Sequence, residues 1–146
     1  MNNIRVIWLL CCTLLINGCS LQLVAHYDKG TMETITQIDQ RIELIFQEML
    51  MVEKANRQFE RYALRYLRVQ VSLNSFKRRQ HFRPHNDETA KQATILLNFW
   101  QQDMSRHQQD NTMSDFIIKR RIKQYRRLID ALIAGEMAKP TNQEML

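Results

Sequence analysis

Apolar residues recur at alternating spacings of three and four along most of this chain of 146 residues, and this periodicity limits the fold more than any other feature. Such spacing places apolar side chains on one face of an α-helix, whereas a half-buried strand would need them at every second position. The first stripe, within about 31–52, predicts one amphipathic helix. Its members are Ile35, Ile38, Ile42, Ile45, Met49 and Val52.

Three further stripes with the same spacing follow, within about 59–76, 90–107 and 118–132. Each predicts a helix that turns one apolar face toward a core. Their members are Phe59, Tyr62, Tyr66, Val69, Leu73 and Phe76, then Ala90, Ala93, Leu97, Trp100, Met104 and His107, then Ile118, Ile122, Tyr125, Ile129 and Leu132.

The junctions between the stripes decide how many helices form. Pro84 disfavours helix at the residue before it, and Asn86 or Asp87 can cap the helix that follows. A polar stretch at 108–115 separates the last two stripes. Four amphipathic helices with short links predict an all-α fold, a small antiparallel up-and-down bundle. The first junction, at 53–57, is marked only by a slip in phase, so a three-helix bundle with a long first helix is the alternative.

Composition agrees with an all-α fold. The chain contains only three glycines and two prolines, which leaves few residues suited to the tight turns that sheets require. Met, Leu, Gln, Arg, Lys and Glu are abundant, and all of them favour helix.

The first residues have the pattern of a secretory signal. Arg5 is followed by an uncharged apolar run from Val6 to Ile16. This run is well short of the roughly 20 residues that a transmembrane helix needs. The pattern therefore predicts export rather than a membrane-spanning anchor.

The run ends in Ile16-Asn17-Gly18-Cys19, which resembles a bacterial lipobox. The resemblance implies that signal peptidase II cuts before Cys19, that its thiol carries diacylglycerol, and that the new amino terminus carries an acyl chain such as palmitate. In enteric lipoproteins a residue other than Asp at the next position permits transfer to the outer membrane, and Ser20 resembles that case. The alternatives are a secretory signal without lipidation or a fortuitous cysteine.

These features predict four regions of the chain. Residues 1–18 form a lipoprotein signal peptide, and 19–30 form the lipidated N-terminus and tether. Residues 31–139 form the helical bundle domain, and 140–146 form a loose C-terminal tail.

Cysteine usage limits the chemistry of the mature chain. Cys11 and Cys12 leave with the signal, and no cysteine follows Cys19. Disulfides, thiolate metal sites and cysteine nucleophiles are therefore excluded together.

Histidines and carboxylates offer no clear catalytic pattern. His81 and His85 lie four apart, but Pro84 between them makes a regular helix improbable. Asp103 and His107, one helical turn apart, predict a surface pair rather than a catalytic dyad. No Ser-His-Asp order, glycine-rich phosphate loop or HExxH motif occurs. We therefore expect no enzyme activity, no cofactor and no metal.

Two kinds of helix face are candidates for function. Leu64, Leu67 and Val71 form a second apolar stripe, opposite the core stripe of their helix; Ile95 and Phe99 repeat this on the next helix. Helices that are apolar on two sides either lie inside the bundle or present one side to a partner.

Basic residues define the second candidate face. Lys119, Lys123 and Arg126 share one flank of the last helix, and the formal net charge is +6. The ordinary interpretation is a solvated face, and the alternative is contact with anionic lipid or envelope glycan. Export argues against nucleic acid as the partner. Arg57, Arg61, Arg65 and Arg68 form a looser basic cluster on the second helical segment.

Together these observations predict a membrane-anchored periplasmic lipoprotein, at the outer rather than the inner membrane. We expect it to act as a non-catalytic protein-interaction or assembly factor of the cell envelope. Its partner would be an envelope protein or a second copy of the chain. The alternative is a binder of anionic lipid or envelope glycan through the basic helix faces.

Overall fold

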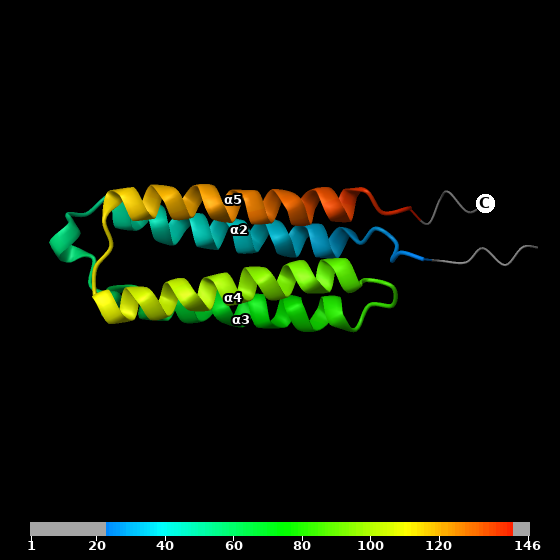
Figure 1. The fold of residues 1–146 in the computed structure, drawn as a ribbon, viewed down its shortest axis with the longest axis horizontal. Helices are drawn as coiled ribbons and strands as arrows, with labels where there is room; N and C mark the ends of the chain where they lie inside the picture. The colour runs from blue at the N-terminus through cyan, green and yellow to red at the C-terminus, as the bar shows by residue number, and fades with distance from the viewer. Residues whose placement is uncertain (1–22, 142–146) are drawn as a thin grey trace, which may run out of the picture.

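The computed structural model describes residues 23–141, which form four α-helices and two short 3₁₀ turns (Figure 1). This part of the chain contains no strand, so the prediction of an all-α bundle is confirmed. The elements are α2 (Lys29–Leu50), η1 (Lys54–Asn56), η2 (Phe59–Arg61), α3 (Ala63–His81), α4 (Asp87–Asp110) and α5 (Asp115–Met137).

The alternative of three helices with a long first helix is wrong. α2 ends at Leu50, and the two 3₁₀ turns separate it from the start of α3 at Ala63. The slip in apolar phase at 53–57 therefore marks a true break. A continuous helix would have rotated one of the two stripes away from the core.

Local sequence accounts for several helix ends. The Asp28 carboxylate accepts hydrogen bonds from the backbone N–H groups of Gly30 and Thr31, which caps the start of α2. Asn111 ends α4 in the left-handed conformation, with φ 49°, a backbone region that Asn tolerates better than most residues. Ser114 caps α5 by accepting from the N–H of Ile117.

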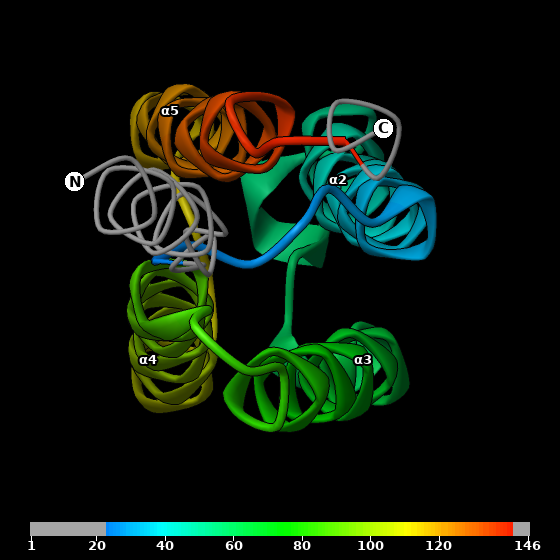
Figure 2. The ribbon, with the colours of Figure 1, turned by 90° about the vertical axis from the view of Figure 1, so that its right-hand side faces the viewer.

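The four helices pack lengthwise as two close pairs. α3 lies chiefly against α4, and α2 lies chiefly against α5 (Figures 1 and 2). The link between α3 and α4 is at one end of the bundle, together with residues 23–28 and the end of α5. The links α2–α3 and α4–α5 are at the other end. The pairs leave two seams, one between α2 and α3 and one between α4 and α5.

The predicted stripes form the core of the bundle. Large aromatic side chains fill its centre, where Trp100 lies 4.9 Å from Tyr66 and 5.8 Å from Tyr125 between ring centroids. The Trp100 indole N–H donates to the backbone oxygen of Tyr66 over 3.2 Å, so this buried polar group is satisfied. Buried stripe residues from the four helices include Ile35, Ile38, Ile42, Tyr66, Val69, Leu73, Ala93, Leu97, Trp100, Ile118, Ile122 and Ile129.

Candidate functional site

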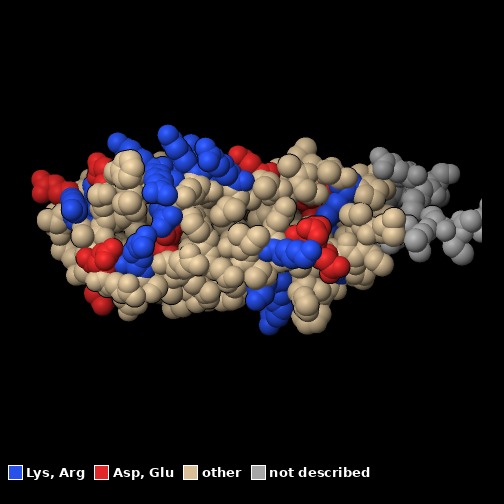
Figure 3. Space-filling view, viewed as in Figure 1, with Lys and Arg blue, Asp and Glu red and all other residues tan. Residues whose placement is uncertain are grey.

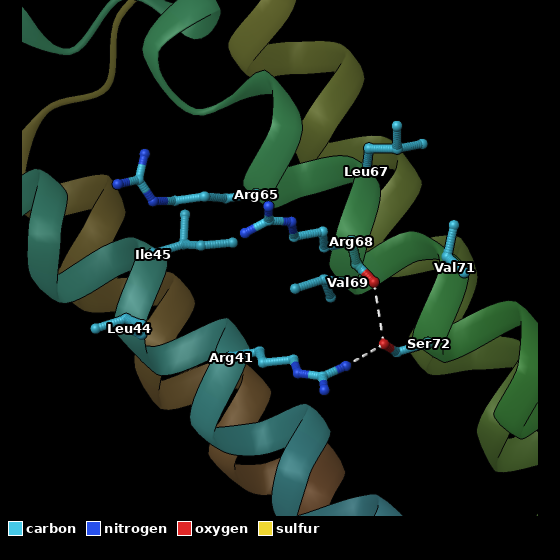
Figure 4. A pocket seen from close by; sticks show the side chains of 9 residues that line it. All are labelled: Arg41, Leu44, Ile45, Arg65, Leu67, Arg68, Val69, Val71 and Ser72. Carbon is cyan, nitrogen blue, oxygen red and sulfur yellow. Dashed lines mark hydrogen bonds between the residues drawn. The ribbon is translucent and has the colours of Figure 1, made fainter.

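The α2–α3 seam is hollowed on its outer side into a groove of about 600 Å³ (Figure 4). Ile45 and Val69 are buried at its floor, where they point toward one another. Arginine side chains extend from both helices across the space above them. We call this the α2–α3 groove. Its lining residues are Arg41, Leu44, Ile45, Arg65, Leu67, Arg68, Val69, Val71 and Ser72.

The groove combines apolar and cationic groups. Leu44 on α2 and Leu67 and Val71 on α3 are exposed over 56%, 53% and 56% of their surface, and they lie on the two sides of the groove (Figure 4). Arg41 and Arg68 project from α2 and α3 between these side chains (Figure 4). Apolar contacts can therefore form beside cations that accept carboxylate partners.

The arginines are held by contacts across the seam. Arg41 donates to the hydroxyl oxygen of Ser72, which itself donates to the backbone oxygen of Arg68 over 3.0 Å (Figure 4). Arg65 lies 2.8 Å from a carboxylate oxygen of Glu48 on α2. Because these contacts are partly exposed, an incoming carboxylate can compete for the guanidinium groups.

The hollow continues in both directions along the seam. A second hollow of about 290 Å³ shares Arg41, Val71 and Ser72 with it and extends to Thr34 on α2. A third, of about 320 Å³, shares Arg65 and extends past Met51. The α2–α3 groove is thus the middle one of three adjoining hollows along this seam.

The opposite seam, between α4 and α5, differs in chemistry. Its hollow of about 660 Å³ is lined by amide, hydroxyl and basic side chains, and its surface is more polar than apolar. An apolar partner would gain little there by leaving water. The lining residues are Asn98, Gln101, Gln102, Ser105, Arg106, Gln109 and Arg121.

Leu64, Leu67 and Val71 all lie exposed on α3, so an inner position for this helix is wrong. α3 buries its core stripe and Gln80, because α2 and α4 cover that side of the helix. Leu67 and Val71 line the groove, whereas Leu64 does not. On α4, Ile95 is exposed, but Phe99 is half-buried beside Tyr125, with 4.9 Å between ring centroids.

Sequence reasoning missed the half of the groove that α2 contributes. Leu44 falls outside the apolar stripe of its helix, and this departure from the stripe is the signal that could have indicated it. Arg41 gave no such signal, because one arginine on a polar face is ordinary.

The basic flank of α5 is separate from the groove. Lys119, Lys123 and Arg126 are all exposed, and Lys and Arg side chains gather over the first half of α5 (Figure 3). Arg126 forms an ion pair with Glu43 of α2, so part of its charge is already compensated. Around the bundle, α2 lies between α5 and α3 (Figure 2).

The predicted basic cluster on the second helical segment included Arg57, and this assignment is wrong. Arg57 is only 3% exposed, and it donates to the backbone oxygens of Val52 and Met113, each over 3.0 Å. Its guanidinium also lies 2.6 Å from the exposed carboxylate of Asp115. Arg57 therefore joins the two links at this end of the bundle.

The prediction that Asp103 and His107 form a surface pair is also wrong, because both are buried. Asp103 accepts from the Tyr125 hydroxyl over 3.0 Å and lies 2.7 Å from Nε of Arg121. Burial raises the pKa of Asp103, against the opposing influence of Arg121. These contacts join α4 to α5 inside the bundle.

A charged cluster closes the end of the bundle that contains the α3–α4 link. Glu136 is fully buried and accepts from the backbone N–H of Asp28 over 2.9 Å. It also pairs with Arg83 and Lys139, which balance its charge. Nothing in the apolar periodicity marked these residues. Gln80, Asn86 and Thr31 complete the cluster.

Two further findings concern residues 23–141 only. No helix in this range is both long enough and apolar enough to cross a membrane. No three His, Cys, Asp or Glu side chains within it are arranged to hold a metal ion. Cys19 and the rest of the lipobox lie outside the described residues.

The fold and groove define a helical bundle with a basic, partly apolar groove on one seam. No family model matches the chain, no curated protein matches its sequence, and no solved structure matches it.

Proposed function

We propose that this chain is a lipid-anchored protein of the bacterial envelope that acts, without catalysis, by binding a protein partner in the α2–α3 groove. One observation carries the proposal. Leu44, Leu67 and Val71 are each more than half exposed beside the arginines of one groove. In this proposal the four helices run in antiparallel order and form the scaffold that holds the two sides of the groove.

The chemistry of the groove indicates what kind of partner it fits. An amphipathic segment could place aliphatic side chains against Leu67 and Val71 and carboxylates against Arg41 and Arg68. A second copy joined symmetrically through this face would oppose arginines with arginines, which is unfavourable. We therefore propose an acidic segment of a different envelope protein.

The anchor is the part of the proposal that rests on sequence. Acylation of Cys19 would supply two or more chains, and each buried methylene contributes about 0.8 kcal/mol, so attachment would be stable. Ser20 favours the outer membrane. Replacing Cys19 with Ala should abolish acylation, which mass spectrometry of the mature amino terminus measures. An unmodified Cys19 with its signal still attached would contradict the anchor.

Photo-crosslinking in intact cells, with the native anchor kept, tests the groove. A photoreactive residue at Ser72, on the groove wall, should capture a partner, and Leu67→Gln should remove that product. The free energy of unfolding should change by no more than about 0.5 kcal/mol, because Leu67 is already exposed. Ile95→Gln is the matched control, since Ile95 is 54% exposed on α4, outside the groove. Equal loss of the product in both variants would contradict a docking role for the groove.

A second candidate function is binding of anionic lipid or envelope glycan by the basic flank of α5. The exposure of Lys119 and Lys123 favours it. Added salt should weaken binding by the α5 flank throughout, whereas it should weaken only the Arg41 and Arg68 contacts of the groove and leave the apolar contacts at Leu67 and Val71. Capture that disappears with added salt and with Lys123→Glu, but not with Leu67→Gln, would favour this second function.

A further inference from the structure

The chain enters the bundle at the end that contains the α3–α4 link, and it is fixed there from Ala25 onward. The N–H of Ala25 donates to the backbone oxygen of His85, and the N–H of Tyr27 donates to that of Pro140, both over 2.9 Å. Arg83 donates to the backbone oxygen of His26. Residues 25–28 therefore lie across the end of the bundle, as Figure 2 shows.

The short distance along the chain from Cys19 to Ala25 limits where an anchored bundle can stand. Six residue steps span at most about 20 Å even when fully extended. The 24 residues of α4 make that helix about 36 Å long. A membrane-bound Cys19 therefore keeps the α3–α4 end near the lipid, while the end with η1 and η2 can stand well away from it.

Exposed apolar side chains are present at this same end. Phe82, in the α3–α4 link, is 76% exposed, Leu23 is 74% exposed, and Met137 at the end of α5 is 67% exposed. Aromatic and aliphatic side chains of this kind gain free energy at the boundary between headgroups and acyl chains. They do not gain this free energy when they are exposed to water.

Charged side chains at this end are compatible with an anionic lipid surface, but basic and acidic residues oppose each other there. Lys77 and Arg78, on the last turns of α3, are exposed and would attract anionic headgroups. Asp87 and Glu88, also exposed, oppose them in part, although Glu88 pairs with Lys91 over 2.8 Å. Contact must therefore depend mainly on apolar insertion.

We propose that the α3–α4 end of the bundle rests on the phospholipid surface, with Phe82 inserted at the level of the headgroups. This inference rests on the proposed anchor at Cys19. It gives the anchored protein a defined orientation, because the helices then rise away from the membrane and the α2–α3 groove opens sideways along it. A partner embedded in or lying along the same membrane would meet the groove laterally.

Tryptophan fluorescence of the acylated protein in vesicles of phosphatidylethanolamine and phosphatidylglycerol tests this orientation. Phe82→Trp places a reporter at the proposed contact. Phe116→Trp is the matched control, because Phe116 is 71% exposed at the start of α5, the opposite end of the bundle. Trp100 is fully buried and contributes the same background to both variants. Lipids brominated along their acyl chains quench only tryptophans that reach the bilayer.

We expect brominated lipid to quench the emission of the Phe82→Trp protein and to leave that of the Phe116→Trp protein unchanged. Equal quenching of both, or quenching of neither, in a protein that is acylated and floats with the vesicles would overturn the orientation and leave the anchor intact. A protein that mass spectrometry shows to be unacylated, and that does not float, would overturn both the anchor and the orientation. Circular dichroism of each variant confirms that the helices are retained.

Discussion

The Nε2 atom of His107 lies 2.7 Å from the backbone oxygen of Arg57, and His107 is completely buried. Because a carbonyl oxygen can only accept, Nε2 carries the proton of the neutral ring. Nδ1 is then free to accept from the Tyr66 hydroxyl, 3.2 Å away. The neutral imidazole thus joins α4 to the link before α3 and to α3 itself.

This arrangement predicts that acid weakens the fold through His107. Burial lowers the pKa of His107 below its usual value of about 6.5, although the hydrogen bond to Arg57 and the charge of Asp110 oppose this. The unfolded chain therefore binds more protons just below that pH. The stabilisation is complete above about pH 6.5 and is lost as pH falls toward the lowered pKa of the folded state.

Denaturant unfolding of the wild type and of His107→Gln, measured from about pH 7 to 5, checks this prediction. The wild type should lose free energy of unfolding over this range more steeply than the variant. His81→Gln, a change at an exposed histidine, is the matched control. A His107→Gln protein with the same slope as the wild type would contradict the assignment.

Arg57→Ala should lower the free energy of unfolding by about 3 kcal/mol, because it removes the donor from the buried carbonyl of Met113 and from the partly buried carbonyl of Val52. Asp115→Asn is the control, since it removes only the exposed partner of the ion pair and should change stability far less. Thermal or denaturant unfolding measures both. Similar losses in the two variants would mean that the ion pair, rather than the carbonyl contacts, stabilises this end.

Charge reversal on the α5 flank should have unequal effects at two neighbouring positions. Lys123→Glu should change the free energy of unfolding by no more than about 0.5 kcal/mol, because Lys119 and Arg127 lie one turn away on either side. Arg126→Glu should cost about 1 kcal/mol, since it replaces the partner of Glu43 with a like charge.

The same Arg126→Glu change should raise the pKa of Asp39. Burial already raises that pKa, with Glu43 and Asp130 adding to the effect and Arg126 opposing it. Denaturant unfolding measures the stability difference, and NMR titration of the carboxyl group measures the pKa. Equal stability of the Lys123→Glu and Arg126→Glu proteins would contradict the role given to the Glu43 contact.

The four helices and the breaks between them were predictable from the sequence. Residues such as Ile42, Leu97 and Ile129 recur with the period of the helix itself, which is a local property of the backbone. Burying such a stripe is favourable in almost any bundle, so the stripe predicts the helix and its inward face without knowledge of the neighbours. The phase slip at 53–57 and Pro84 indicated breaks for equally local reasons.

The tertiary structure alone decided which partners satisfy the buried polar groups and which apolar groups are exposed. His107 needs Tyr66 and Arg57, and Asp103 needs Tyr125, and each of these partners is distant in sequence. Leu67 shows the converse, because its exposure depends on the pairing of α3 with α4, which leaves its side of the helix uncovered. Periodicity reports that a helix has a second apolar stripe. Whether a neighbour covers that stripe depends on the packing of all four helices, and this packing also forms the groove.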